Sequence, residues 1–216
     1  MGLITVKDMR AITAQLAEKD KKFAPVIENS ELCPLGQKRN TQSHYQVLVS
    51  SVLSQQLAIK AAATIKGRVK DLAGGTISPE NMGKLRVDQL RGAGASGAKA
   101  RTILELTDAT LSGAIPFHKF GRMGNDEITA ELTALWGIGR WTVEMFLMHH
   151  MNRLDVWPVG DLGVRRGWEL LHRLKDQIEP EALDRLGGKF DGYQSVVAWY
   201  CWRAIDLDRE AKKSSK

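Results

Sequence analysis

The chain has 216 residues with a formal net charge of +6, and 43% of its residues are hydrophobic and 26% charged. This length is enough for one large domain or two small lobes with a sizeable core, and the modest basic excess favours an anionic partner. No apolar run is long enough to cross a bilayer, and the N-terminus lacks the apolar core of a signal peptide. We therefore expect an intracellular protein that does not bind membranes.

The chain has only two cysteines, Cys33 and Cys201, which are far apart in the sequence. There is no Cys-x-x-Cys pair and no Cys/His cluster, so neither a zinc site nor a disulfide framework is indicated. We expect no metal held by side chains.

The first third of the chain predicts helices separated by short breaks. Met9, Ile12 and Leu16 form a helical stripe, and Pro25 and Pro34 then break the chain. Two further helices are expected over residues 47–53 and 58–72. The second of these helices is expected to turn one face inward, made of Ala61, Ala62, Ile65 and Val69.

A glycine-rich turn over residues 92–97 leads into a helix over residues 98–111, with Lys99 and Arg101 beside the turn. These two basic residues are either structural or in contact with phosphate, and the sequence leaves both interpretations open.

The most informative stretch runs over residues 131–167. Asn125-Asp126-Glu127 is typical of a helix start, and Ile128, Leu132 and Leu135 recur at helical spacing. The sequence Gly137-Ile138-Gly139 then predicts a tight hairpin into a second helix that ends near Asn152. Glycine at both positions permits a left-handed backbone and close approach of another molecule. The N–H groups that begin the second helix make a natural phosphate site.

Asp161 opens the helix that follows this unit. Aspartate is a common N-cap, so a purely structural role is the simplest interpretation. A rigidly held cap can also be a catalytic carboxylate, and the two roles are compatible.

No stretch shows the sustained alternation of a half-buried strand. The sequence therefore predicts an all-α protein of about ten helices in two lobes with a cleft between them. We expect one lobe, residues 1–40 plus 125–216, to carry the hairpin and Asp161, and residues 41–124 to form the other.

Three sequence segments resemble the helix-hairpin-helix DNA glycosylases, specifically their 3-methyladenine DNA glycosylase II branch. The central one is Leu-Trp-Gly-Ile-Gly-Arg-Trp-Thr over residues 135–142, followed by Val-Trp-Pro-Val-Gly-Asp-Leu-Gly-Val over residues 156–164. The others are Val-Leu-Ser-Gln-Gln-Leu-Ala over residues 52–58 and Ala-Trp-Tyr-Cys-Trp-Arg-Ala over residues 198–204. The resemblance covers about residues 40–205.

The resemblance implies a set of contacts with double-stranded DNA. Gly137 and Gly139 would present backbone N–H groups to a phosphate, with Arg140 and Thr142 as supports. The carbonyls of Leu135 and Gly137 are candidates for a structural Na⁺ or K⁺, as in other family hairpins. The loop at residues 54–57, which by itself is a plain polar corner, would fill the gap left by an extruded nucleotide. Gln56 is the first candidate for this wedge and Leu57 the second.

The resemblance also implies the chemistry. Asp161 would be the catalytic carboxylate, and Trp141 and Trp199 would line the base pocket; Trp157 and Trp202 have a weaker claim. The bifunctional members have a catalytic lysine at the position of Trp141. An indole is not an amine nucleophile, so we expect base removal without strand cleavage. An aromatic face also suits a positively charged alkylated base.

We therefore expect a monomeric, monofunctional hydrolase that releases alkylated purines, such as 3-methyladenine and 7-methylguanine, from duplex DNA by base flipping and so begins base excision repair. Its place would be the cytoplasm and nucleoid of a bacterium or the nucleus of a eukaryote. Some relatives have an N-terminal β domain, for which we expect this chain to be too short, and some have an iron–sulfur cluster held by four cysteines, which we do not expect in a chain with two. Two alternatives stay open: a glycosylase for a deaminated, oxidised or ethenoadenine base, and a helix-hairpin-helix module that binds DNA without catalysis. Arg165 and Arg166 either contact phosphate or face solvent.

Overall fold

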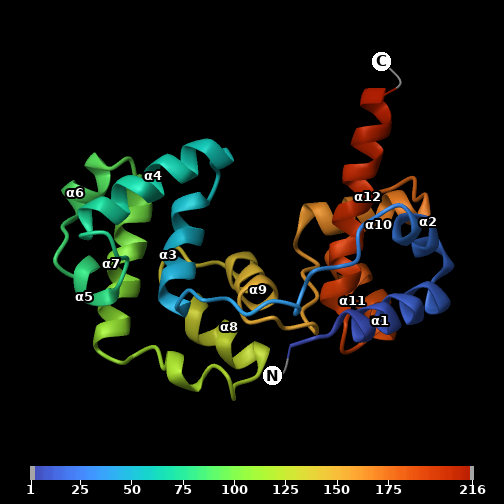
Figure 1. Cartoon of the computed structure of the whole chain (residues 1–216), viewed down its shortest axis with the longest axis horizontal. Helices are drawn as coiled ribbons and strands as arrows, with labels where there is room; N and C mark the ends of the chain where they lie inside the picture. The colour runs from blue at the N-terminus through green and yellow to red at the C-terminus, as the bar shows by residue number, and fades with distance from the viewer. Residues whose placement is uncertain (1–2, 215–216) are drawn as a thin grey trace. The chain divides into compact units, whose positions relative to one another are not determined.

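A computed structural model describes residues 3–214 of the chain. Within this range it contains twelve α-helices and three short 3₁₀ helices, η1 (Lys21–Phe23), η2 (Phe117–Lys119) and η3 (Gly188–Phe190), and no β-strand (Figure 1). The all-α prediction is confirmed, with two more helices than expected. None of the helices in residues 3–214 combines the length and hydropathy that a membrane span requires.

The chain divides into two compact units, Met1–Arg39 with Leu147–Lys216 and Asn40–Phe146. The expected lobes placed residue 40 and residues 125–146 together with Asp161, whereas in this division both fall in the second unit. The reason is visible in the hydrogen bonds and ring contacts that join the hairpin to helix α7 (Gly97–Leu111), described below.

The first unit combines residues from the beginning and the end of the described range. Its helices are α1 (Val6–Lys19), α2 (Ala24–Glu28), α10 (Leu162–His172), α11 (Pro180–Gly187) and α12 (Gln194–Ser214). Buried Trp168 packs edge-on against Phe23 and Phe190 and stacks on His172 at 4.1 Å. Helices α10 and α12 pack closely where Gly167 faces Cys201. Only glycine permits this approach, since a Cβ at position 167 would lie 2.0 Å from the carbonyl oxygen of Cys201.

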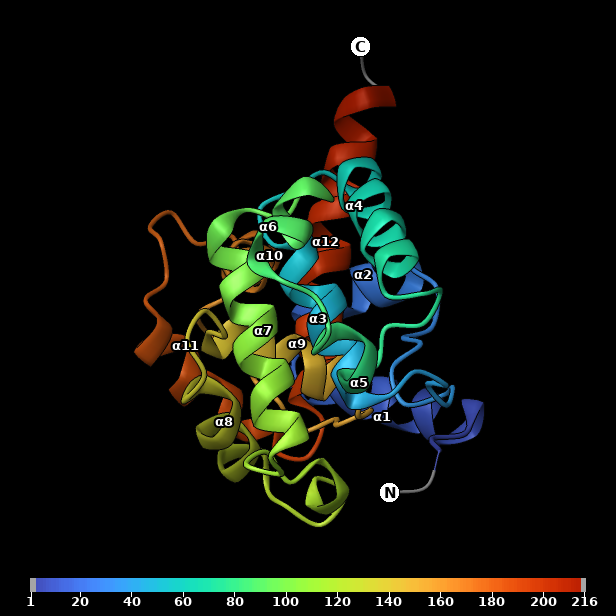
Figure 2. The ribbon, with the colours of Figure 1, turned by 90° about the vertical axis from the view of Figure 1, so that its left-hand side faces the viewer.

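The second unit contains the remaining helices, with α9 running on into the first unit. They are α3 (His44–Ser54), α4 (Ile59–Leu72), α5 (Pro79–Met82), α6 (Val87–Gly92), α7 (Gly97–Leu111), α8 (Asn125–Thr133) and α9 (Arg140–His149). Figure 2 shows this unit with α4, α6 and α7 toward the reader. Helix α3 packs on both α4 and α7, and the Tyr45 hydroxyl lies 2.7 Å from the Thr107 hydroxyl in the buried α3–α7 contact.

The inward face of α4 is confirmed in part. Ala62 and Val69 are buried and Ile65 is half-buried, but Ala61 is exposed. The buried positions follow the spacing of three to four residues that places side chains on one helical face, and Ala61 lies beside that face. The second helix of the hairpin unit also ends earlier than expected, at His149, and Asn152 beyond it has a left-handed φ of 58°.

Candidate active site

The hairpin lies between α8 and α9, as the sequence predicts. Helix α8 begins after Gly124, whose N–H donates to the Glu127 carboxylate at 2.6 Å. After the helix, the Ile138 N–H donates to the Leu135 carbonyl at 3.2 Å, and the Ile138 side chain is buried. An apolar residue at the tip thus anchors the turn that starts α9.

The two glycines of the hairpin have different roles. Gly137 has a φ of 81°, and a Cβ there would lie 2.1 Å from the Thr102 hydroxyl oxygen. Gly139 has no left-handed backbone, and a Cβ built on it would meet no atom within 4 Å. The left-handed conformation that we considered for both is therefore found only at Gly137. Gly139 leaves open space in front of the main chain.

The start of α9 offers backbone donors to an anion. Within residues 3–214, no protein group accepts a hydrogen bond from the N–H of Gly137 or Gly139. Arg140 is next to them with a 70% exposed side chain, held at 3.0 Å from the buried carboxylate of Glu144. Thr142 is 4% exposed, and its hydroxyl lies 3.3 Å from the Gln55 amide nitrogen, so it supports the hairpin from inside.

Helix α7 supports the other side of the hairpin. The Trp136 N–H donates to the Glu105 carboxylate at 3.1 Å, and the Arg101 guanidinium lies 4.4 Å from the Trp136 ring centre. Lys99 donates to the backbone carbonyls of Leu53, in the last turn of α3, and Gln55, in the loop that follows α3. The sequence left the roles of these basic residues open, and in the structure both have partners within the protein.

The carbonyl oxygens proposed for a monovalent cation each accept one hydrogen bond. Leu135 accepts from Ile138, and Gly137 accepts from the Gln55 amide at 3.4 Å. A carbonyl has two lone pairs, so both remain chemically suited to a second, cationic partner. The described residues contain no group of three or more His, Cys, Asp or Glu side chains that could hold a metal ion.

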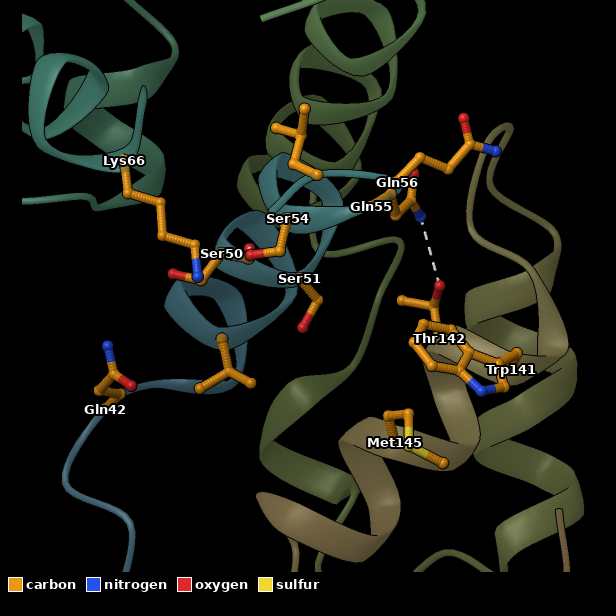
Figure 3. Close-up of a pocket in the computed structure, with 12 residues that line it drawn as sticks. Gln42, Ser50, Ser51, Ser54, Gln55, Gln56, Lys66, Trp141, Thr142 and Met145 are labelled. Carbon is orange, nitrogen blue, oxygen red and sulfur yellow. Dashed lines mark hydrogen bonds between the residues drawn. The ribbon is translucent and has the colours of Figure 1, made fainter. Parts of the chain in front are cut away.

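A cavity of about 610 Å³ lies in the second unit beside the hairpin (Figure 3). This size is typical of a site for a small organic ligand. One side consists of Trp141, Thr142 and Met145 from α9, and α3 contributes serine hydroxyls. The full lining is Gln42, Val47, Ser50, Ser51, Ser54, Gln55, Gln56, Leu57, Lys66, Trp141, Thr142 and Met145.

Both wedge candidates line this cavity. Gln56 is exposed and has a left-handed φ of 55°, which is uncommon for a residue with a side chain. Leu57 is 39% exposed, and Ile59 beyond it is 89% exposed. The loop therefore presents an amide and one apolar side chain to solvent at the edge of the cavity, and Ile59 at the start of α4 is exposed next to them.

Lys66 is a member of the cavity that sequence reasoning missed. It lies on α4, and Figure 3 shows its ammonium end directed toward Ser50, on the side of the cavity away from Trp141. Burial lowers the pKa of this half-buried ammonium. Nothing in the sequence around Lys66 separates it from the other lysines of α4, because its position depends on packing between α3 and α4.

Asp161 lies in the first unit and is the N-cap of α10. Its Oδ1 accepts from the Val164 N–H at 2.8 Å and from the Trp202 indole N–H at 2.9 Å. A Cβ at Gly163 would lie 2.9 Å from the Trp202 ring and 3.0 Å from that oxygen, so glycine is what lets the indole approach. Two donors therefore fix one carboxylate oxygen in a single orientation.

Two tryptophans of α12 are candidates for the base pocket. Trp202, which had the weaker claim, holds Asp161 directly, and His149 stacks beside it with 6.0 Å between ring centres. Trp199 is half-buried and lies edge-on to Tyr200 at 4.7 Å. A base-pocket role for Trp199 stays a prediction. Trp199 and Trp202 are three residues apart and so lie on one helical side, which is the sequence signal that could have pointed to Trp202.

The remaining candidates have structural partners. Arg165 donates to the Ile178 carbonyl at 3.3 Å, and Arg166 pairs with the Glu169 carboxylate at 2.9 Å. Trp157 donates to the Leu183 carbonyl at 3.1 Å. Cys33 and Cys201 are both buried, and burial raises the pKa of the Cys33 thiol to about 12, so neither is a reactive thiolate.

Comparison with known proteins defines the class of this hairpin protein. Residues 49–190 match the family model of the HhH-GPD superfamily base excision DNA repair proteins, and the chain belongs to that family. Over 166 residues it is 36% identical to DNA-3-methyladenine glycosylase 1 of Schizosaccharomyces pombe, covering 76% of this chain and 73% of the relative.

Solved structures agree with this assignment. A DNA-3-methyladenine glycosidase from Bacillus halodurans is similar with a TM-score of 0.80 and 34% identity, covering 90% of this chain and 88% of that one. The 3-methyladenine DNA glycosylase of S. pombe in complex with abasic DNA has a TM-score of 0.78 and 31% identity, covering 89% of this chain and 95% of that one.

Proposed function

We propose that this protein is a monofunctional DNA glycosylase that hydrolyses the N-glycosidic bond of alkylated purines, such as 3-methyladenine and 7-methylguanine, in duplex DNA. The observation that carries the proposal is Asp161, a carboxylate held by Val164 and Trp202 in a chain of the base-excision family. The names of its relatives, which are 3-methyladenine glycosylases, support the lesion class.

The proposed chemistry needs one carboxylate. Alkylation at N3 or N7 makes the purine cationic, so the base leaves with both electrons of the N-glycosidic bond and becomes neutral without a proton from the enzyme. Positive charge then develops on the sugar, where an ionised Asp161 stabilises it and orients the attacking water. The water oxygen bonds to the anomeric carbon and its proton passes to the carboxylate or to solvent. Enzymes with poorer leaving groups need a second carboxyl group as acid.

Trp141 supports both the lesion class and the expected end of the reaction. The resemblance in sequence places it where the bifunctional members have their lysine, and it lines the cavity as a residue that is 51% exposed. An indole stacks on a flipped base and attracts a cationic one by roughly 0.5–2 kcal/mol. It provides no amine for a Schiff base, so the strand stays intact.

The DNA contacts follow from the hairpin and the loop at residues 54–57. The open space before Gly139 and the N–H groups at the start of α9 suit a phosphate, with Arg140 beside them. Gln56, with Leu57 next to it, would replace the flipped nucleotide in the stack. We propose that the protein acts on DNA as a monomer.

The test is a panel of duplexes that each carry one defined base: 3-methyladenine, 7-methylguanine, ethenoadenine, hypoxanthine or none. We expect release of the two methylated purines and tighter binding to their duplexes than to undamaged DNA. Equal binding to every duplex with no release would instead identify a non-catalytic DNA-binding module.

Lys66 favours a second candidate, a glycosylase for neutral lesions such as hypoxanthine or ethenoadenine. A lysine ammonium in the cavity repels a cationic base, by roughly 0.5–2 kcal/mol for two unit charges that solvent partly screens. A neutral base escapes this penalty. The two candidate functions therefore predict different orders of rate for the natural protein: one predicts faster release of the cationic methylated purines, the other faster release of a neutral base such as hypoxanthine.

We expect Lys66→Gln to raise the release of 7-methylguanine relative to hypoxanthine by about three- to tenfold, because it removes the repulsion of the cationic base. The measurement is the ratio of single-turnover rates on the two duplexes. Lys60→Gln, at an exposed lysine of the same helix that does not line the cavity, is the control and should leave the ratio unchanged. An unchanged ratio in Lys66→Gln would remove the charge argument for neutral lesions.

A further inference from the structure

We propose that Lys99 is a positioning residue for the wedge: it holds the loop at residues 54–57 so that Gln56 points out of the protein, and Gln55 ties this loop to the hairpin. The inference rests on the proposed function, since it assigns Lys99 a role in inserting Gln56 into DNA. The four residues concerned, Lys99, Gln55, Gln56 and Gly137, all belong to the second unit.

Lys99 closes the C-terminal end of α3. Its ammonium donates to the carbonyls of Leu53 at 3.0 Å and Gln55 at 2.7 Å. Carbonyls at the end of a helix have no partner within the helix, and a cation there also interacts favourably with the helix dipole. The backbone of Lys99 is itself fixed, because its N–H donates to the Ser96 hydroxyl at the start of α7. A rigid helix therefore places the ammonium beneath the loop.

The residue that follows these carbonyls has a conformation that needs such support. Gln56 has a φ of 55°, a region that residues with a Cβ seldom occupy unless the surroundings determine it. Within residues 3–214, the Gln56 side chain makes no hydrogen bond to the protein. The support must then come through the backbone, where Lys99 holds the preceding carbonyl and the Leu57 N–H donates to the Ser54 carbonyl at 3.2 Å.

Gln55 joins the same loop to the hairpin. Its amide nitrogen lies 3.3 Å from the Thr142 hydroxyl and 3.4 Å from the Gly137 carbonyl, and Figure 3 shows the first of these bonds. Each bond is long and weak, but together they span the space between the loop and the start of α9. A phosphate held by the hairpin would in this way fix the distance from the DNA backbone to Gln56.

The alternative role for Lys99 is direct contact with phosphate. The two short bonds to carbonyls argue against it, since they occupy two of the three ammonium protons. The roles differ in their consequences. Loss of a phosphate contact weakens binding to all duplexes and reduces its salt dependence, whereas loss of a positioning contact slows base release and leaves binding to undamaged DNA unchanged.

The experiment is a double-mutant cycle of Lys99→Met and Gln56→Ala, with Lys99→Arg as the conservative variant and Lys84→Met, at an exposed lysine of the same unit, as the charge control. Single-turnover release of a methylated purine is measured together with the affinity for undamaged duplex. We expect Lys99→Met to slow release about tenfold, because small displacements of positioning groups have large effects on rate. Lys99→Arg should keep most of the rate, and Lys84→Met all of it.

The cycle gives the decisive result. If Lys99 acts through Gln56, Lys99→Met has no further effect in the Gln56→Ala background, and affinity for undamaged duplex stays within about twofold of the natural protein. Additive effects, or an affinity loss that matches the rate loss, would overturn the proposal.

A second measurement does not depend on catalysis. Hydrogen exchange at the Leu57 N–H should become at least about tenfold faster in Lys99→Met, while α7 keeps its protection. Unchanged exchange would overturn the inference even if the protein released no base. Faster exchange in a protein that releases no base would support the Lys99 contact and reject the proposed function.

Discussion

Replacing Asp161 by Asn is expected to reduce the single-turnover release of alkylated purines at least about a hundredfold while leaving the fold intact. Asparagine is as good an N-cap as aspartate, and its carbonyl oxygen can still accept from Val164 and Trp202. The substitution therefore removes the negative charge and little else. The measurement is the amount of free base released from duplex DNA with one 3-methyladenine or 7-methylguanine.

The control for this substitution is Asp155→Asn, at an exposed carboxylate in the connection before α10. It should release base at the rate of the natural protein, and both variants should unfold within a few degrees of it. If Asp161→Asn keeps full activity, Asp161 is only a helix cap and the chemistry must be carried by another group.

The hairpin glycines give the second large effect, because the same substitution should destabilise the protein at Gly137 and leave its stability unchanged at Gly139. Gly137→Ala should destabilise the protein by about 2–4 kcal/mol, since the new Cβ would overlap Thr102 and the backbone is left-handed there. Gly139→Ala should leave the free energy of unfolding within about 0.5 kcal/mol, because its Cβ meets open space. The measurement is denaturant unfolding of both variants.

At Gly139 the substitution should affect DNA binding, although it leaves the stability of the protein unchanged. A methyl group placed where the phosphate backbone approaches should weaken binding to undamaged duplex by about tenfold, although the fold is unaffected. Binding at the level of the natural protein by Gly139→Ala would mean that the DNA backbone does not approach the hairpin at this point.

The fold could be predicted from the sequence because its signals are local. The spacing of Ile128, Leu132 and Leu135 and the Gly-x-Gly turn predict the two helices of the hairpin, and both are found. The position of Asp161 at the start of a helix could also be predicted, since N-capping depends on residues only three positions apart. The spacing of apolar residues did not predict that Ala61, at the edge of a helical face, is exposed, or that α9 ends at His149.

The candidate site was less predictable because its contacts join residues far apart in the chain. The bond from Trp202 to Asp161 spans 41 positions, and the contact of Lys99 with the Leu53 carbonyl spans 46. Lys66 reaches the cavity only through the packing of α4 on α3. The different surroundings of Gly137 and Gly139 likewise depend on α7, which no local pattern places against the hairpin.

The most direct test of the proposed function measures two products in one reaction, free base and broken strands, with the natural protein and duplex DNA that carries a single 3-methyladenine. We predict stoichiometric release of 3-methyladenine and intact strands that break only after alkali is added. Strand cleavage without alkali would contradict the monofunctional mechanism and direct attention to Lys66, the lysine that lines the cavity with Trp141. If the protein binds the duplex but releases no free base, the proposed glycosylase activity is contradicted.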